Sequence, residues 1–298
     1  MNGNLSRLNF RLLGVFIIVL LTVGCSSIPV GKFDVLAESS QGILNGTSET
    51  YTRIEKLQRN YVVERVPNAP LSRDTFHPVT IVNGQIESFD LTPELDFRED
   101  ALQVLVNYTL VLQALAKRDF EGDVDKAAAD FAGSVKSLAA TAAPNNDNAQ
   151  KASGILATVV DVIGREIIRK ERLEALKTVM DSAQTGIEKL AQLIVGDNTL
   201  IKGSVDRMIK TILTHKNIQR PPIDTLERSN FDTNVSLIIS EADEINNALD
   251  NIDAAIKEVP LAHADIRTML DGKPKNLDAL AQLVKDAQRI NKLYRSLK

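Results

Sequence analysis

Residues 173–194 read LEALKTVMDSAQTGIEKLAQLI, and their apolar side chains recur at alternating steps of three and four residues. This spacing places one narrow apolar seam along a helix. The same spacing of apolar residues does not continue toward the N-terminus, because the next position of the seam is occupied by the charged residue Arg169. Over residues 155–167 the apolar positions follow a shifted frame instead. We therefore expect a helical element over residues 148–195, with a stutter or a bend between residues 165 and 172. The sequence alone does not establish whether this helix is continuous.

Similar seams run along most of the remaining chain. They predict helices from Phe33 to Tyr61, from Thr92 as N-cap to Leu115, over 123–142, from Ile201 to about 219, from Val235 to Val259 and from Leu277 to Leu297. The breaks expected between them are Pro144 with Asn145–Asn148, Gly196-Asp197-Asn198, Pro221-Pro222 and Gly272-Lys273-Pro274. Pro260 is expected to stop or to kink its helix.

One segment has a different character. Residues 62–91 are rich in proline, and Asn83-Gly84 lies between short stretches of β-branched residues. Asn-Gly in this setting is the strongest short-range sign of a two-residue hairpin turn. We expect a small β-hairpin near residues 79–89, with Ile81 opposite Ile86, inserted between the first two long helices.

Helices with narrow apolar seams bury them by packing side by side at small crossing angles. The predicted fold is therefore all-α. It is an elongated antiparallel helical bundle of long, coiled-coil-like helices, with the small β-hairpin as an insertion. A single domain of this kind is expected over residues 33–298.

Composition narrows the function. The chain has 298 residues, with 35 Lys and Arg, 39 Asp and Glu, and a formal net charge of −4, which argues against binding to nucleic acid. A single Cys leaves no intramolecular disulfide and no cysteine-based metal site. The sequence contains no phosphate-binding glycine loop and no Gly-x-Ser-x-Gly motif. We therefore expect that the protein binds no cofactor and no metal ion, and that it is not an enzyme.

The three histidines do not form a metal-binding pattern. Di-metal sites of helical bundles need Glu three residues before His, and His77, His215 and His263 have no such Glu. His215 and His263 lie near expected helix ends. We predict that each histidine lies at the surface or at the end of a helix.

The N-terminus has the layout of an export signal. Arg7 and Arg11 precede a run of 13 apolar or small residues, 12–24, which is shorter than the ~20 residues of a membrane-spanning helix. The only Cys follows directly. The sequence Leu21-Thr22-Val23-Gly24-Cys25 resembles the lipobox of bacterial lipoproteins.

The resemblance implies that signal peptidase II removes residues 1–24 and that Cys25 carries the lipid. Ser26, rather than Asp, follows the Cys, which implies the outer membrane with the protein facing the periplasm. The inner membrane and the cell surface are the alternatives. Residues 25–32 would form a lipidated linker of short reach, because the seven residues after Cys25 span at most ~24 Å.

Two charged helix faces are candidate surfaces for a partner. They comprise the acidic residues Glu241, Glu244, Asp250 and Asp253 and the basic residues Lys285, Arg289, Lys292 and Arg295. Charge runs commonly mark solvated faces, and a helix dipole favours cations near the C-terminus. The functional alternative is docking of either face on a protein, or of the basic stripe on anionic lipid.

These features favour a lipid-anchored, non-enzymatic envelope protein that acts as a scaffold or adaptor through its helix faces. A membrane-active or pore-associated protein is the first alternative, because residues 154–168 are apolar on most sides. The competing interpretation of that segment is the central helix of the bundle. An enzyme with an unrecognised site is the second alternative. The sequence identifies neither the partner nor the oligomeric state.

Overall fold

The computed structural model describes residues 28–65, 79–82, 85–88, 91–117, 123–141, 147–169, 171–223, 226–273 and 275–295. Seven helices make up the packed body in these ranges. They are α2 (Val30–Arg65), α3 (Thr92–Ala116), α4 (Asp123–Thr141), α5 (Asp147–Arg169), α6 (Arg172–Ile218), α7 (Leu226–Leu270) and α8 (Asp278–Arg295). The prediction of an all-α helical bundle is confirmed.

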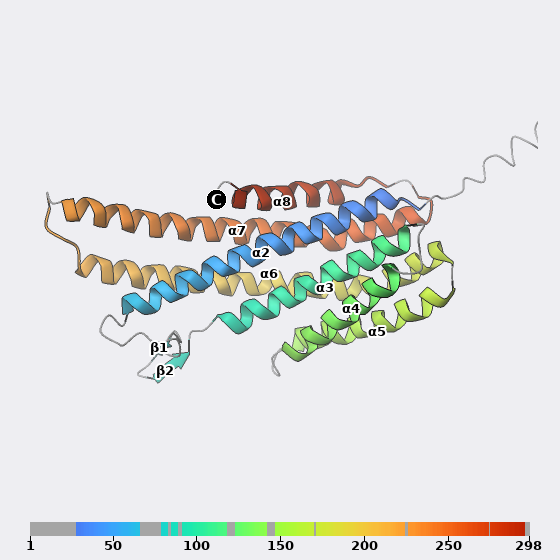
Figure 1. The fold of residues 1–298 in the computed structure, drawn as a ribbon, viewed down its shortest axis with the longest axis horizontal. Coiled ribbons are helices and arrows are strands. Elements are labelled where there is room, and N and C mark those ends of the chain that lie inside the picture. The colour runs from blue at the N-terminus through green and yellow to red at the C-terminus, as the bar shows by residue number, and fades with distance from the viewer. Residues whose placement is uncertain are drawn as a thin grey trace, which may run out of the picture.

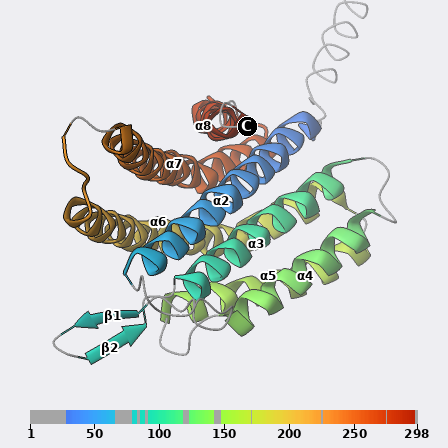
Figure 2. The same cartoon turned by 60° about the vertical axis from the view of Figure 1, so that its left-hand side comes forward.

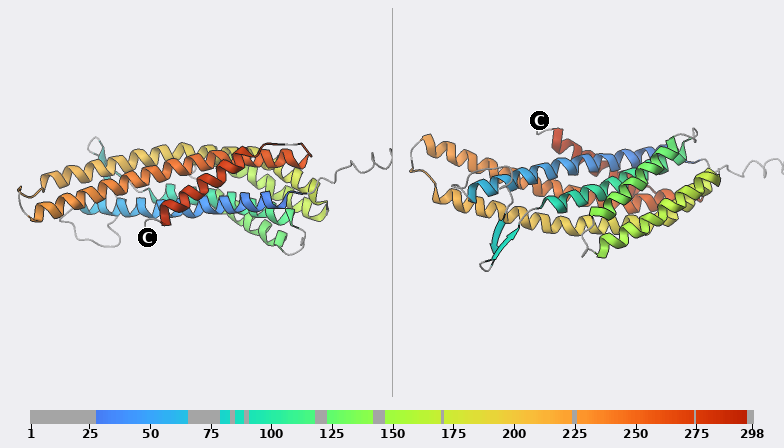
Figure 3. Two further views of the ribbon diagram at one scale, coloured as in Figure 1. Left: turned by 90° about the horizontal axis from the view of Figure 1, so that it is seen from above. Right: turned by 60° about the horizontal axis from the view of Figure 1, so that its bottom comes forward.

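The helices lie along one long axis, and each runs antiparallel to the one before it (Figures 1 and 3). α2, α3, α6 and α7 pack on one another in the centre, α8 covers α2 and α7, and α4 and α5 flank α3 and α6 (Figure 2). The chain enters α2 at one end of the body, and the α6–α7 connection lies at the other. With 47 residues at ~1.5 Å each, α6 alone is about 70 Å long.

Two short strands lie beside this helical body. β1 (Val79–Val82) and β2 (Gln85–Ser88) pair with each other in antiparallel fashion, with Ile81 opposite Ile86. This is the register of a two-residue turn. The turn residues themselves lie outside the described residues.

The helical element expected over residues 148–195 is not continuous. α5 ends at Arg169 and α6 begins at Arg172, and the two helices pack against each other in opposite directions. The shift of the apolar frame therefore marks a reversal of the chain rather than a bend. In one continuous straight helix the two apolar faces would point in different directions. The reversal of the chain lets the apolar faces of α5 and α6 pack against each other.

One expected break is wrong, and another does not end its helix. Gly196-Asp197-Asn198 lies inside α6, because helices α3 and α7 provide partners for the two polar side chains. Pro260 lies inside α7, which continues to Leu270. A proline removes one backbone hydrogen bond from a helix. Here the helix continues because its apolar side stays in the core beyond the proline, as the burial of Ala262 and Ile266 shows.

Some helix ends differ from the expected ones as well. Thr92 is the first residue of α3 rather than its N-cap, and Leu91 occupies the cap position without a side-chain hydrogen bond. α2 begins at Val30, three residues before Phe33, and Ile28 and Val30 pack against the core. α7 begins at Leu226, nine residues before Val235.

The core is divided into two apolar clusters. One lies toward the start of α2 and includes Phe33 and Ile187, and the other lies toward the α6–α7 connection and includes Tyr51 and Met208. Between the clusters, the four central helices contribute buried polar side chains. We call these the polar layer: Thr47, Thr50, Arg98, Asn198 and Asp253.

Candidate interaction surfaces

Two acidic residues of α7 face α2. Glu244 Oε2 lies 3.0 Å from Arg53 Nη1, and Glu241 Oε1 lies 3.5 Å from Lys56 Nζ. The four side chains line a groove of about 460 Å³ between the helices. Solvent-exposed ion pairs contribute less than about 1 kcal/mol each, so a charged partner can compete with them.

The other two acidic residues face α6. Lys202 forms ion pairs with both Asp250 and Asp253. Asp250 is exposed, whereas Asp253 belongs to the polar layer, where its Oδ1 accepts a hydrogen bond from Asn198 Nδ2. Burial raises the pKa of the Asp253 carboxyl, and the Asn198 bond and Lys202 act in the opposite direction. The structure therefore places Asp253 inside the bundle, away from Glu241 and Glu244 on the outer surface.

The basic residues of α8 face solvent. Lys285, Arg289 and Lys292 are exposed, while the opposite side of the helix buries Leu283 and Ile290 in the core. Arg289 Nη1 lies 3.4 Å from Asp286 Oδ1 of the same helix. The side chain of Arg295 lies outside the described part of the structure. α8 therefore presents a basic stripe on the outer side of the bundle.

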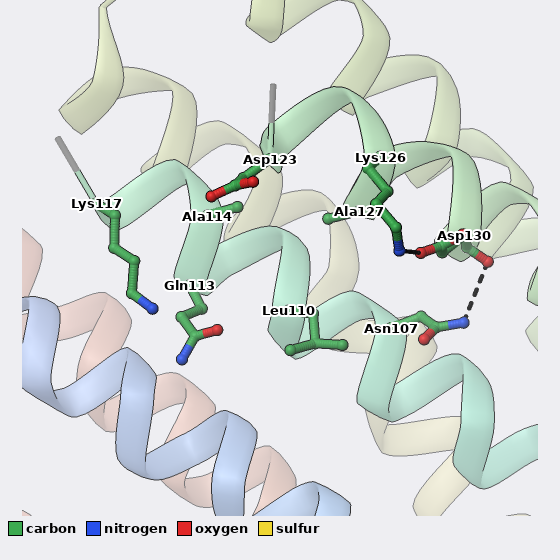
Figure 4. Close-up of a pocket in the computed structure, with 9 residues that line it drawn as sticks. All are labelled: Asn107, Leu110, Gln113, Ala114, Lys117, Asp123, Lys126, Ala127 and Asp130. Atoms are coloured by element: carbon green, nitrogen blue, oxygen red, sulfur yellow. Dashed lines mark hydrogen bonds and ion pairs between the residues drawn. The ribbon is translucent and has the colours of Figure 1, made fainter. Parts of the chain in front are cut away.

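A hollow of about 190 Å³ lies between α3 and α4 (Figure 4). Leu110 contributes the exposed apolar surface, and Lys126 Nζ donates to Asp130 Oδ2 at 2.8 Å. Gln113 and Lys117 bind Asp34 of α2, at 2.7 and 3.3 Å respectively. Small-molecule sites have volumes of about 300–1,000 Å³, so this hollow is small for a ligand.

His263 forms a buried hydrogen-bonded chain that the sequence analysis missed. It lies inside α7 and is only 1% exposed, so the surface position expected for it is wrong. His263 Nδ1 donates to Gln184 Oε1 at 2.6 Å, which leaves Nε2 to accept from Tyr108 Oη at 2.8 Å. Gln184 Nε2 in turn donates to the carbonyl of Pro260. Every ring nitrogen is therefore satisfied, and the imidazole is neutral.

Burial lowers the pKa of His263 from 6.5 to about 3. Asp181 raises this pKa slightly and Arg267 lowers it, but desolvation dominates. A sequence feature could have revealed the burial. The seam Ile252, Ile256 and Val259 reaches residue 263 after a further step of four, so His263 lies on the seam when the helix is continued through Pro260.

The polar layer contains a buried ion pair. Arg98 is 3% exposed, and its Nη2 lies 3.2 Å from Asp197 Oδ2. Arg98 Nη1 also donates to the carbonyl of Glu94. Burial raises the pKa of Asp197, and Arg98 opposes this effect. Within the described residues, Arg98 Nε and the hydroxyl of nearby Tyr51 have no hydrogen-bond partner.

The apolar segment 154–168 has a place in the core. Leu156, Val159 and Ile163 of α5 are buried against the neighbouring helices, and Asp161 faces solvent. Among the described helices, none combines the length and apolar character needed to cross a bilayer. Cys25 and His77 lie outside the described residues.

Comparison with known proteins gives no relative for this chain. No protein-family model matches it, and no similar protein was found among curated proteins or solved structures.

Proposed function

We propose that this protein is a lipid-anchored, non-enzymatic scaffold or adaptor of the bacterial envelope, held at the outer membrane and facing the periplasm. One structural observation supports the proposal above all. α2 begins at Val30, only five residues after Cys25, and it begins at one end of the elongated body. Five extended residues span at most ~18 Å. Acyl chains on Cys25 would therefore hold that end beside the bilayer.

The function of such a protein is positional. The anchored end stays at the membrane, and helices of up to about 70 Å carry exposed faces away from it. The basic stripe of α8 and the acidic side of α7 are the faces we propose for a protein partner, with the hairpin between α2 and α3 as a third contact. Because exposed ion pairs are weak, these charges can exchange partners at little cost.

Cys25→Ala is expected to abolish lipid attachment completely, because the variant lacks the sulfur that receives the diacylglyceryl group. The measurement is incorporation of labelled fatty acid, together with the size of the product after inhibition of signal peptidase II. Ser26→Ala is the matched control and should be labelled and cleaved like the wild type. Equal labelling of Cys25→Ala would contradict the anchor.

A second experiment tests the adaptor part of the proposal. A photo-crosslinking amino acid at Lys285 or Lys292 of α8 is expected to capture a defined envelope protein in living cells. The same group at Lys151, an exposed residue of α5, is the control. Capture from α8 but not from α5, identified by mass spectrometry, is the expected result. Identical crosslinking patterns at all three positions would contradict a specific role for α8.

A further inference from the structure

Three buried polar atoms in and beside the polar layer have no hydrogen-bond partner among the described residues. They are the hydroxyl of Tyr51, Nε of Arg98 and Oδ1 of Asn198. The three residues are 2%, 3% and 0% exposed, so bulk water does not reach these atoms. Buried polar groups of native proteins are nearly always hydrogen-bonded, either to the protein or to an ordered water molecule. The three atoms therefore need a partner that the described side chains do not supply.

The packing of the four central helices brings these groups to one level of the bundle. Tyr51 of α2 belongs to the second apolar cluster, together with one residue from the facing part of each of the other three helices: Leu95, Ile201 and Leu249. Each of these three residues lies one helical turn from a member of the polar layer, namely Arg98, Asn198 and Asp253 respectively. Residues one turn apart lie on the same face of a helix. The ring of Tyr51 therefore lies directly beside the polar layer.

Two further observations agree with this placement. Ser48, one turn before Tyr51 on α2, donates a hydrogen bond to Glu99 of α3, the residue next to Arg98. Burial raises the pKa of the Tyr51 hydroxyl, Arg98 lowers it, and three carboxylates on α3, α6 and α7 raise it further. A charge shifts the pKa of another group only when the two lie close together. The Tyr51 hydroxyl is therefore close to the charged side chains of the polar layer.

The chemistry of the three atoms selects one ligand. Arg98 Nε can only donate a hydrogen bond, the Tyr51 hydroxyl can donate one, and Asn198 Oδ1 can only accept. A direct bond from Tyr51 to Asn198 would leave Arg98 Nε without a partner. One water molecule can accept from Tyr51 and Arg98 and donate to Asn198, and three bonds are the usual number for a buried water. A chloride ion would face the Asn198 oxygen and the nearby carboxylates, and a cation would face the N–H of Arg98.

We propose that Tyr51, Arg98 and Asn198 form the binding site of one structural water molecule in the centre of the bundle. Arg98 Nε and the Tyr51 hydroxyl donate to the water oxygen, and the water donates to Asn198 Oδ1. The site depends on the packing of the helices alone. It depends neither on the membrane anchor nor on the scaffold function proposed above.

The bound water links α2 to the polar layer. Thr47 and Thr50, which α2 contributes to the layer, donate hydrogen bonds to carbonyl groups of their own helix. The contacts that join the other central helices within the layer are direct, as between Arg98 and Asp197. Through the water, the Tyr51 hydroxyl of α2 is joined to side chains of α3 and α6. The water therefore extends the hydrogen-bonded network of the layer to the fourth helix.

The test is a crystal structure of the full chain, solubilised in detergent, at a resolution that shows ordered water molecules. We expect one spherical peak of electron density within hydrogen-bonding distance of Tyr51 Oη, Arg98 Nε and Asn198 Oδ1. The same structure of Tyr51→Phe should lack this peak, because the variant removes one of the three groups that hold the water. Tyr108→Phe is the matched control. It also removes a buried hydroxyl, but one that binds His263 directly, so the peak should keep its wild-type height.

Three results would overturn the proposal. The first is a wild-type structure without the peak, in which the three atoms bind other groups of the protein. The second is a peak of wild-type height in Tyr51→Phe. The third is an anomalous peak at this position in crystals grown in sodium bromide, which would assign the site to an anion. Thermal unfolding followed by circular dichroism verifies that both variants fold, and the wild-type structure tests the site without them.

Discussion

Lowering the pH from 7 to 5 is expected to reduce the free energy of unfolding by about 2 kcal/mol through His263 alone. In the folded protein the ring is buried and neutral, because its pKa is about 3. In the unfolded chain the same ring has a pKa of about 6.5 and takes up a proton as the pH falls. The unfolded state therefore gains stability at acidic pH and the folded state does not.

The sign and the window of this effect follow from the two pKa values. The contribution of His263 is fully present above pH 6.5, and it is lost at about 1.4 kcal/mol per pH unit as the pH falls toward 3. Burial also raises the pKa of the Asp197 and Asp253 carboxyls, so their protonation changes the stability at acidic pH as well, and the wild type alone does not isolate the histidine. The comparison must be made with a variant.

The variant is His263→Gln, which keeps polar atoms near Tyr108 and Gln184 but cannot be protonated. Urea unfolding of both proteins at pH 7, 6 and 5 gives the measurement. We expect the stability difference between the wild type and the variant to shrink by about 2 kcal/mol over this range. Parallel curves from pH 7 to 5 would show that the ring is not sealed from solvent.

Arg98→Met is expected to lower the free energy of unfolding by about 3 kcal/mol. The substitution removes the partner of Asp197, whose carboxylate is 23% exposed, and leaves its charge beside the core. Breaking a buried ion pair costs about 3–5 kcal/mol, and the partial exposure of Asp197 places the effect at the lower end. The substitution also removes the donor to the carbonyl of Glu94.

Two controls define the origin of this loss. Arg53→Met breaks the more exposed pair with Glu244 and should cost less than about 1 kcal/mol. The double variant Arg98→Met/Asp197→Leu removes both charges and should be more stable than Arg98→Met alone. Chemical denaturation measures all three variants. A double variant that is no more stable than the single one would show that the charge of Asp197 is not the cause.

Much of the fold could be predicted from local patterns. The seam over residues 173–194 lies in α6 with Leu176, Met180 and Ile187 buried, because a period of 3.6 residues alone decides which side of a helix is apolar. The expected breaks were less reliable. Rules for glycine, proline and asparagine consider nearby residues only, whereas Asn198 Nδ2 donates a hydrogen bond to Asp253, 55 residues away.

The candidate surfaces could be predicted only in part. The acidic and basic residues were identified from their helical spacing, but spacing does not say which helix lies opposite. Asp253 faces inward because Asn198 and Lys202 of α6 lie opposite it and bind its carboxylate. A local sequence pattern cannot predict which residues of another helix lie opposite. The strong exposure of Ile223 was not predicted, because this residue lies between two helices and outside any helical period.

The polar layer also determines how far α3, α6 and α7 can slide along one another. A heptad seam repeats, so a displacement by seven residues, about 10.5 Å, still places apolar side chains opposite apolar ones. The same displacement would separate Arg98 from Asp197 and would place Asn198 among aliphatic side chains, away from Asp253. Only one alignment of α3, α6 and α7 forms both of these contacts between helices. The polar layer thus fixes the positions of these helices relative to one another along the bundle axis. The length of the bundle is constant for this reason.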